Sequence, residues 1–249
     1  MQAPVGFQCV DCVRRAAAAR PTPRTRFGAP ASRSGRPLLT YGLIALCVVM
    51  YALQLGVSGL TDATAFAPAA MSEVWFEPWR MLTSSIVHSP GNAMHLAFNM
   101  LALWFIGRTL EPALGLWRYA ALLVLSAIGG SAAVLWLTDP QTPTLGASGI
   151  VFGLFGALFV LMRSAGGQVG GIAVLLAVNL VFSFAVPNIS WQGHLGGLLT
   201  GVLCAAVIAY APRGRLRGTW QALGLASAAV LLVILTWAGM LSYADLVAG

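Results

Sequence analysis

Charged side chains are scarce in this sequence, and lysine is missing altogether. Of the 249 residues only 8% are charged, all fourteen basic residues are arginine, and Asp and Glu together number seven. A soluble globular domain carries about 25% charged residues. Because the chain is also 58% apolar, its composition excludes a soluble globular protein.

Seven apolar runs account for this composition. Crossing a hydrocarbon core of about 30 Å takes roughly 20 residues, and backbone groups in lipid must be hydrogen-bonded within a helix. The runs that approach this length are 38–57, 93–110, 116–137, 147–162, 169–186, 192–211 and 220–243. The sequence therefore predicts an all-α, polytopic helical membrane protein with seven spans.

The arginines are unevenly distributed along the chain. Seven of them precede the first span, and with the N-terminus inside, thirteen of the fourteen fall in inner segments. Only Arg80 falls outside, which is the bias expected when the N-terminus is cytoplasmic. The net charge of +7 therefore indicates membrane topology and attraction to anionic membrane lipid. We expect no nucleic-acid partner.

Residues 1–37 are rich in Arg, Pro, Ala and Ser, which is typical of a disordered arm. No apolar run precedes the arginines, so we expect no signal peptide. Cys9 and Cys12 are spaced like half of a zinc site, but zinc normally takes four ligands. Cys47 and Cys204 lie within spans, so we expect a reduced pair without metal; the alternative is the remnant of a zinc-ribbon domain. The predicted division is a cytoplasmic arm 1–37, a six-span core 38–211, and a segment 212–249 that carries the seventh span.

Ionisable and polar residues within a span often serve function, and five of them are candidates here. They are His95, Asn99, Ser148, Asn179 and His194. In the predicted topology the second, fourth and sixth spans all enter from the outer side. This places His95, Asn99, Ser148 and His194 at a similar depth, whereas Asn179 has no predicted partner and is interpreted as structural.

This set of residues fits nucleophilic catalysis of acyl transfer. A serine needs a base within hydrogen-bond reach, and a neutral imidazole is the usual base near pH 7. Ser148 and His194 supply that pair. His95 and Asn99, at i and i+4 on one helix face, could stabilise an oxyanion together with the Ser148 backbone N–H at a helix N-terminus. Gly146 and Gly149 would let a peptide approach closely.

Each element also has a structural interpretation when taken alone. The tetrapeptide Gly146–Gly149 could simply begin a helix, and His95 and Asn99 could link helices. The repeat of Gly193, Gly197 and Gly201 is first of all a close-packing face. His88 is interpreted as an interfacial residue. The functional interpretation rests on the shared depth and the complementary roles of the set.

With these residues in hand, the chain resembles the rhomboid intramembrane serine proteases over about residues 38–211. Five motifs occur in the family's order: Glu77-Pro78-Trp79-Arg80, His95-Leu96-Ala97-Phe98-Asn99, Glu111-Pro112-Ala113-Leu114-Gly115, Gly146-Ala147-Ser148-Gly149, and His194-Leu195-Gly196-Gly197 continuing to Gly201. In addition, Phe152 falls one turn after Ser148, where the family often has an aromatic residue packed on the catalytic histidine.

The resemblance implies a Ser–His dyad, with Ser148 as nucleophile and His194 as general base. It implies oxyanion stabilisation by His95 and Asn99, and supporting roles for Phe152 and for the motif residues Trp79, Arg80, Gly146, Gly149, Gly197 and Gly201. The implied fold is a rhomboid six-helix core, here with a seventh C-terminal transmembrane helix. The implied activity is endopeptidase cleavage of transmembrane protein substrates without a cofactor, in the plasma membrane, at a site open to the outer face.

Other classes are weighed against this one. An aspartyl intramembrane protease needs two carboxylates within spans, and a zinc type needs HExxH; this sequence has neither. A catalytically inactive rhomboid-like protein that binds transmembrane helices is the main alternative, although Ser148 and His194 are both present. A transporter is less favoured, because no inverted repeat is evident.

Overall fold

The computed structural model describes residues 2–3, 6–7, 9–18, 23–30, 35–72, 76–187 and 189–248. Helices occupy all seven predicted spans: α2 (Leu38–Gly56), α5 (Ala93–Leu114), α6 (Leu116–Leu137), α7 (Ser148–Ser164), α8 (Gly170–Ala185), α9 (Trp191–Tyr210) and α10 (Arg217–Ala248). Within the described ranges, the only strands are the short pair β1 (Gln2–Ala3) and β2 (Gly6–Phe7). The prediction of an all-α, polytopic helical membrane protein is confirmed.

The helices differ in how well they suit a membrane. Among the described residues, α2, α6, α9 and α10 are long and apolar enough to cross one. Helices α7 and α8 are apolar but shorter, with 17 and 16 residues. Helix α5 has 22 residues but carries polar and charged side chains. Large apolar side chains are exposed along α2, α5, α8 and α10, which is the surface expected to face lipid.

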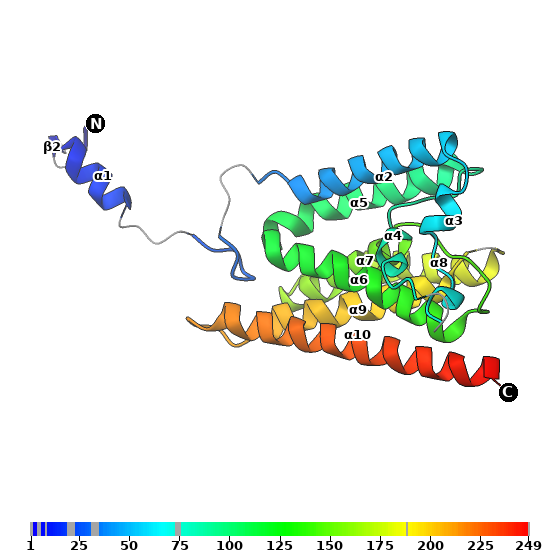
Figure 1. Ribbon diagram of the computed structural model, residues 1–249. Helices are drawn as coiled ribbons and strands as arrows, with labels where there is room; N and C mark the ends of the chain where they lie inside the picture. The colour runs from blue at the N-terminus through cyan, green and yellow to red at the C-terminus, as the bar shows by residue number, and fades with distance from the viewer. Residues whose placement is uncertain are drawn as a thin grey trace.

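Helix α7 lies inside the bundle, against α5, α6 and α9, while α2 packs on α5 and α10 runs along α6 and α9 (Figure 1). Glycines allow the closest approach, between α7 and α9. A Cβ on Gly197 would lie 2.0 Å from the carbonyl oxygen of Gly149, and one on Gly201 would lie 2.0 Å from that of Gly153. The glycines predicted as a packing face therefore bring the start of α9 against the start of α7.

A buried carboxylate joins α2 to α5 at the opposite end of the bundle. Glu111 accepts hydrogen bonds from the backbone N–H groups of Leu39 and Thr40 at 2.9 and 2.8 Å, and from the Thr40 hydroxyl at 2.7 Å. Amides at a helix N-terminus lack partners within the helix, so a carboxylate satisfies them there. The predicted span ends at residue 110; instead α5 continues through Leu114, and Gly115, with φ of 74°, makes the turn.

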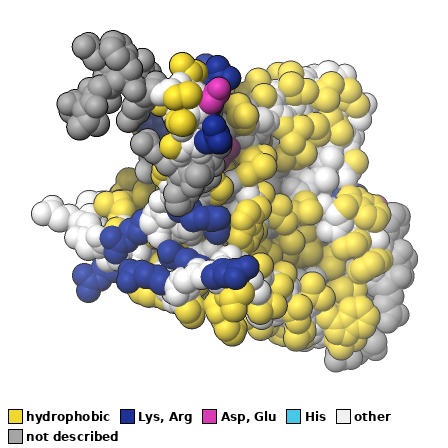
Figure 2. Space-filling view, turned by 90° about the vertical axis from the view of Figure 1, so that its left-hand side faces the viewer, with side chains coloured by type: hydrophobic (Ala, Val, Ile, Leu, Met, Phe, Trp, Pro, Cys, Tyr) yellow, Lys and Arg dark blue, Asp and Glu magenta, His cyan; other side chains and the backbone are white. Residues whose placement is uncertain are grey.

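Part of the predicted disordered arm has regular structure. Helix α1 spans Val10–Ala18, and residues 24–30 pack on the bundle through the buried Phe27 and Ala29. Arginines gather at this end of the molecule (Figure 2); the exposed ones include Arg24, Arg26, Arg163, Arg213 and Arg215. We call it the basic end, and the opposite end, where α5, α7 and α9 begin, the site end. Residues 1, 4–5, 8, 19–22 and 31–34 of the arm lie outside the described residues.

The connection from α2 to α5 lies at the site end and contains α3 (Leu60–Thr64), the 3-10 helix η1 (Pro68–Ala70) and α4 (Arg80–Thr83). It pairs with the segment that leads into α7. Phe66 and Thr144 exchange backbone hydrogen bonds of 3.0 and 2.7 Å, and the Gly146 N–H donates to the Ser84 carbonyl at 2.8 Å. These bonds fix the chain immediately before Ser148.

Candidate active site

Ser148 is the first residue of α7 and is half-buried. Gly146, two residues earlier, has a φ of 120°, a conformation that glycine adopts without strain. The first N–H groups of an α-helix have no intrahelical acceptor, and the helix dipole makes this end positive. The backbone around Ser148 is therefore suited to stabilise negative charge.

His88 supports the residue before the serine. It is fully buried, and its Nε2 accepts a hydrogen bond from the Ala147 N–H at 3.4 Å. Burial, together with a smaller effect of the neighbouring His95, lowers the pKa of His88 to about 4. The ring is therefore neutral at neutral pH and keeps a lone pair for Ala147. The sequence had suggested only an interfacial residue here.

His95 and Ser148 face the same space beside Gly146. A Cβ on Gly146 would lie 2.6 Å from His95 Nε2 and 3.8 Å from Ser148 Oγ, so glycine leaves this space open. His95 Nδ1 accepts a hydrogen bond from the Ser89 N–H at 3.5 Å. A neutral imidazole with Nδ1 as acceptor carries its proton on Nε2. His95 thus presents an N–H donor to the space next to the serine.

Asn99 lies one helical turn after His95 on α5 and is buried. Its Nδ2 donates to the His95 carbonyl oxygen at 2.8 Å. Like His95 and His194, Asn99 is not among the residues that line the pocket beside Ser148. Asn99 contacts the backbone of His95 rather than the space beside the serine.

His194 lies in the first turn of α9, whose N-cap Ser190 accepts from the Gly193 N–H at 3.3 Å. Its buried ring stacks on Phe152 of α7, with ring centroids 4.2 Å apart and an interplanar angle of 14°. Because Phe152 is one helical turn beyond Ser148, this stacking holds the imidazole beside the start of α7. Among the described residues, no hydrogen bond joins Ser148 Oγ to His194.

The other side of the His194 ring has a partner that the sequence did not predict. His194 Nδ1 lies 2.7 Å from the hydroxyl oxygen of Ser183 on α8. A serine near the end of an apolar helix gives no sign in the sequence of such a contact. The interhelical geometry alone identifies it.

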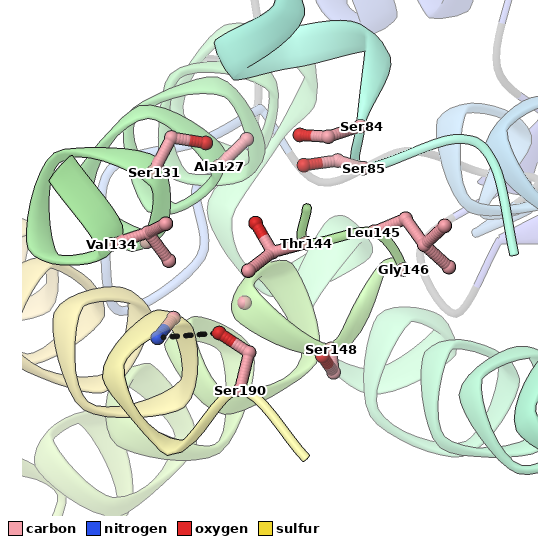
Figure 3. Close-up of a pocket in the computed structure, with 13 residues that line it drawn as sticks. Ser84, Ser85, Ala127, Ser131, Val134, Thr144, Leu145, Gly146, Ser148 and Ser190 are labelled. Atoms are coloured by element: carbon pink, nitrogen blue, oxygen red, sulfur yellow. Dashed lines mark hydrogen bonds between the residues drawn. The ribbon is translucent and has the colours of Figure 1, made fainter. Parts of the chain in front are cut away.

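A pocket lined mainly by small and hydroxyl-bearing residues opens next to Ser148 (Figure 3). Its walls come from α6, from the segment after α4, from the turn before α7 and from the start of α9. The lining residues that can form side-chain hydrogen bonds are Ser84, Ser85, Ser131, Thr144, Ser148 and Ser190. Gly146 and Gly149 also line it, so the predicted close-approach glycines border the serine's pocket.

Trp79 and Arg80, which were predicted as supporting residues, belong to the start of α4 in the connection between α2 and α5. Trp79 is exposed and, like Arg80, does not line this pocket. Arg80 forms an ion pair with Glu77 and donates to the carbonyl oxygens of Asp62 and Ala65. It thereby braces the connection between α2 and α5, which in turn holds Gly146.

Metal-binding side chains are not grouped in the described part of the chain, where no set of three or more His, Cys, Asp or Glu could hold an ion. Cys9 and Cys12 are free and exposed, and Cys47 and Cys204 are free and buried.

Known proteins resemble this chain over the region that carries the site. Residues 76–211 match the family model of the Rhomboid domain. The rhomboid protease GluP of Bacillus subtilis is 35% identical over 188 residues, which are 71% of this chain and 36% of GluP. The rhomboid protease GlpG of Serratia proteamaculans is 29% identical over 184 residues, 70% of this chain and 63% of GlpG.

A plant relative matches less of the chain. RHOMBOID-like protein 5 of Arabidopsis thaliana is 33% identical over 146 residues, 55% of this chain and 46% of that protein. The matched regions span from about a third to just under two thirds of these three relatives. Since the family model covers more than half of the sequence, the chain belongs to the rhomboid family.

Proposed function

We propose that this protein is an intramembrane serine endopeptidase that cleaves transmembrane proteins within or near their membrane-spanning helices. The observation that carries the proposal is the juxtaposition at the start of α7: Ser148 in the first turn, and the His194 ring stacked on Phe152 one turn away. The relatives GluP and GlpG, which are named as proteases, support it.

The proposed mechanism uses a dyad. His194 Nε2 takes the proton of the Ser148 hydroxyl while Oγ attacks the substrate carbonyl carbon. The oxyanion receives hydrogen bonds from the Ser148 N–H and from His95 Nε2, with Asn99 supporting His95. The C–N bond breaks as His194 returns the proton to the leaving amine. Water then hydrolyses the acyl-enzyme by the same path, and the hydroxyl-lined pocket offers it hydrogen-bond partners.

The orientation in the membrane is part of the proposal. The exposed arginines of the basic end favour a cytoplasmic location for that end (Figure 2). The site end, with the pocket beside Ser148, then opens to the outer face of the plasma membrane. Residues 38–211 would form the protease core, and α10 an added transmembrane helix.

A fluorophosphonate probe, which reacts covalently with activated serines, tests the dyad directly. We expect the purified wild-type protein to be labelled at Ser148 and the His194→Ala variant to lose the label, because a serine without a base is a weak nucleophile. Labelling is read by in-gel fluorescence, with the site mapped by mass spectrometry. Folded wild-type protein that remains unlabelled would favour the alternative, an inactive rhomboid-like protein that binds transmembrane helices.

The oxyanion donors should contribute unequally. Removing one such donor typically lowers the rate by about 10²–10³-fold. We expect His95→Ala to approach this loss in kcat and Asn99→Ala to lose less, because His95 Nε2 faces Ser148 whereas Asn99 bonds to the His95 carbonyl. Cleavage of a fluorogenic transmembrane substrate in micelles measures both variants.

The control for this pair is Thr109→Ala, at an exposed position near the other end of α5, which should keep the wild-type rate. Equal activity of Asn99→Ala and wild type would leave Asn99 with a structural role only.

A further inference from the structure

Helix α8 is exposed along most of its length but buries one side chain. All 16 residues of α8 are described, and only Ser183 among them is buried, at 3% exposure. Its neighbours Phe182 and Phe184 are 58% and 57% exposed. Burying a hydroxyl away from water is unfavourable unless it is hydrogen-bonded. Ser183 therefore faces the bundle for a polar contact, and that contact is His194.

The direction of the hydrogen bonds at Ser183 follows from its two partners. Its Oγ donates to the carbonyl oxygen of Asn179, one turn earlier, at 2.7 Å. A carbonyl can only accept, so this bond uses the single proton of the hydroxyl. Only lone pairs of Ser183 Oγ remain for His194 Nδ1, which lies 2.7 Å away. Nδ1 must then carry a proton and donate it.

This assignment fixes the tautomer of His194. A neutral imidazole carries one proton, so protonation at Nδ1 leaves the lone pair on Nε2. The lone pair on Nε2 is the form that a general base for a serine requires. The stacking on Phe152 fixes the plane of the ring, and the bond to Ser183 fixes which nitrogen is turned toward α8.

In a Ser–His–Asp triad, the carboxylate holds the imidazole in the productive tautomer and stabilises the imidazolium that forms during the reaction. We propose that Ser183 is the positioning residue of this site. Its hydrogen bond to His194 orients the imidazole, as the carboxylate does in a triad. The inference rests on the proposed protease function and adds a third polar member to the dyad. As a neutral acceptor, Ser183 orients the ring at a smaller cost of burial than a carboxylate would have.

Kinetics of substituted proteins test the role of Ser183. The bond to Nδ1 becomes charge-assisted when the imidazolium forms, so Ser183→Ala should lower kcat by roughly 10- to 100-fold with little change in KM. Ser183→Thr keeps the hydroxyl and should recover most of the rate. The matched control is Ser227→Ala on α10, an exposed serine that makes the same bond to the carbonyl one turn earlier, to Leu223 at 3.0 Å.

The outcomes separate this inference from the proposed function. If wild type cleaves substrate but Ser183→Ala matches Ser227→Ala in kcat, or Ser183→Thr is no better than Ser183→Ala, the positioning role is wrong while the protease function stands. If wild type does not cleave at all, the proposed function is wrong, and a positioning role for Ser183 in that reaction is wrong with it.

A spectroscopic measurement tests the tautomer without relying on catalysis. The chain has only three histidines, so ¹⁵N-histidine NMR spectra in micelles are simple, and His194→Ala assigns the relevant signals. We expect a protonated Nδ1 on His194 in wild type and in Ser183→Thr, and a shift toward the other tautomer in Ser183→Ala. A wild-type His194 with an unprotonated Nδ1 would overturn the inference.

Discussion

Replacing Ser148 with alanine should reduce cleavage of a transmembrane substrate by about 10³-fold or more, to the level of protein-free vesicles. The substitution removes the only atom proposed to bond covalently to the substrate, and a dyad that acts as a unit loses nearly all of its catalysis with either member. The measurement is the appearance of cleavage fragments after co-reconstitution of enzyme and substrate in lipid vesicles.

The fold of Ser148→Ala should be preserved, since the half-buried side chain does not cap α7. Its thermal midpoint in micelles is expected within a degree or so of wild type. No hydrogen bond joins Ser148 Oγ to another described residue, and substitutions that break no such contact usually change stability by no more than about 0.5 kcal/mol. Ser242→Ala, an exposed serine on α10, serves as the matched control for cleavage and stability. Substantial cleavage by Ser148→Ala would remove this residue as the nucleophile.

Hydropathy could predict the number and order of the spans because lipid requires long apolar helices. It could not predict where helices begin and end when polar contacts decide this. Helix α5 extends past residue 110 because Glu111 is buried there and accepts hydrogen bonds from the first amides of α2. These amides lie about seventy residues earlier in the chain. The packing of residues 24–30 against the basic end was missed for the same reason: composition indicates solubility of the arm but not its contacts.

The residues of the candidate site also divide into those that the sequence could predict and one that it could not. Topology could predict that Ser148, His95, Asn99 and His194 lie at the same end of the bundle, because their helices all begin there. Their roles stay predictions, based on complementary chemistry. Ser183 could not be predicted, since a serine on an apolar helix more often bonds only to its own backbone, as Ser227 does. The contact with His194 depends on how α8 rotates against α9, and neither hydropathy nor motif spacing encodes that rotation.

The second large effect is expected from a single methyl group between α7 and α9. In Gly201→Ala the new Cβ would lie 2.0 Å from the Gly153 carbonyl oxygen and 2.5 Å from the Gly153 Cα. These are backbone atoms, so no side chain can rotate away and the helices must separate. Overpacking of this kind costs about 1–3 kcal/mol or more, and we expect the thermal midpoint in micelles to fall by about 5–10 °C.

The matched control is Gly42→Ala in the second turn of α2, where no atom lies within 4 Å of the added Cβ. Because alanine is a better helix former than glycine by about 1 kcal/mol, this variant should be as stable as wild type or slightly more stable. Equal midpoints for Gly201→Ala and Gly42→Ala would show that α7 and α9 are not packed as closely as described.

The variant Gly197→Ala distinguishes an effect on packing from an effect on catalysis. Its Cβ would clash with α7 as closely as that of Gly201→Ala, but nearer Ser148. Its Cβ would lie 2.0 Å from the carbonyl oxygen of Gly149, the residue next to Ser148. Both variants should lose similar stability, whereas fluorophosphonate labelling at low temperature, where both remain folded, should fall further in Gly197→Ala. Labelling that falls equally in both would mean that the start of α7 moves as a rigid body with the rest of the helix, and that the spacing of the whole α7–α9 pair sets the position of Ser148.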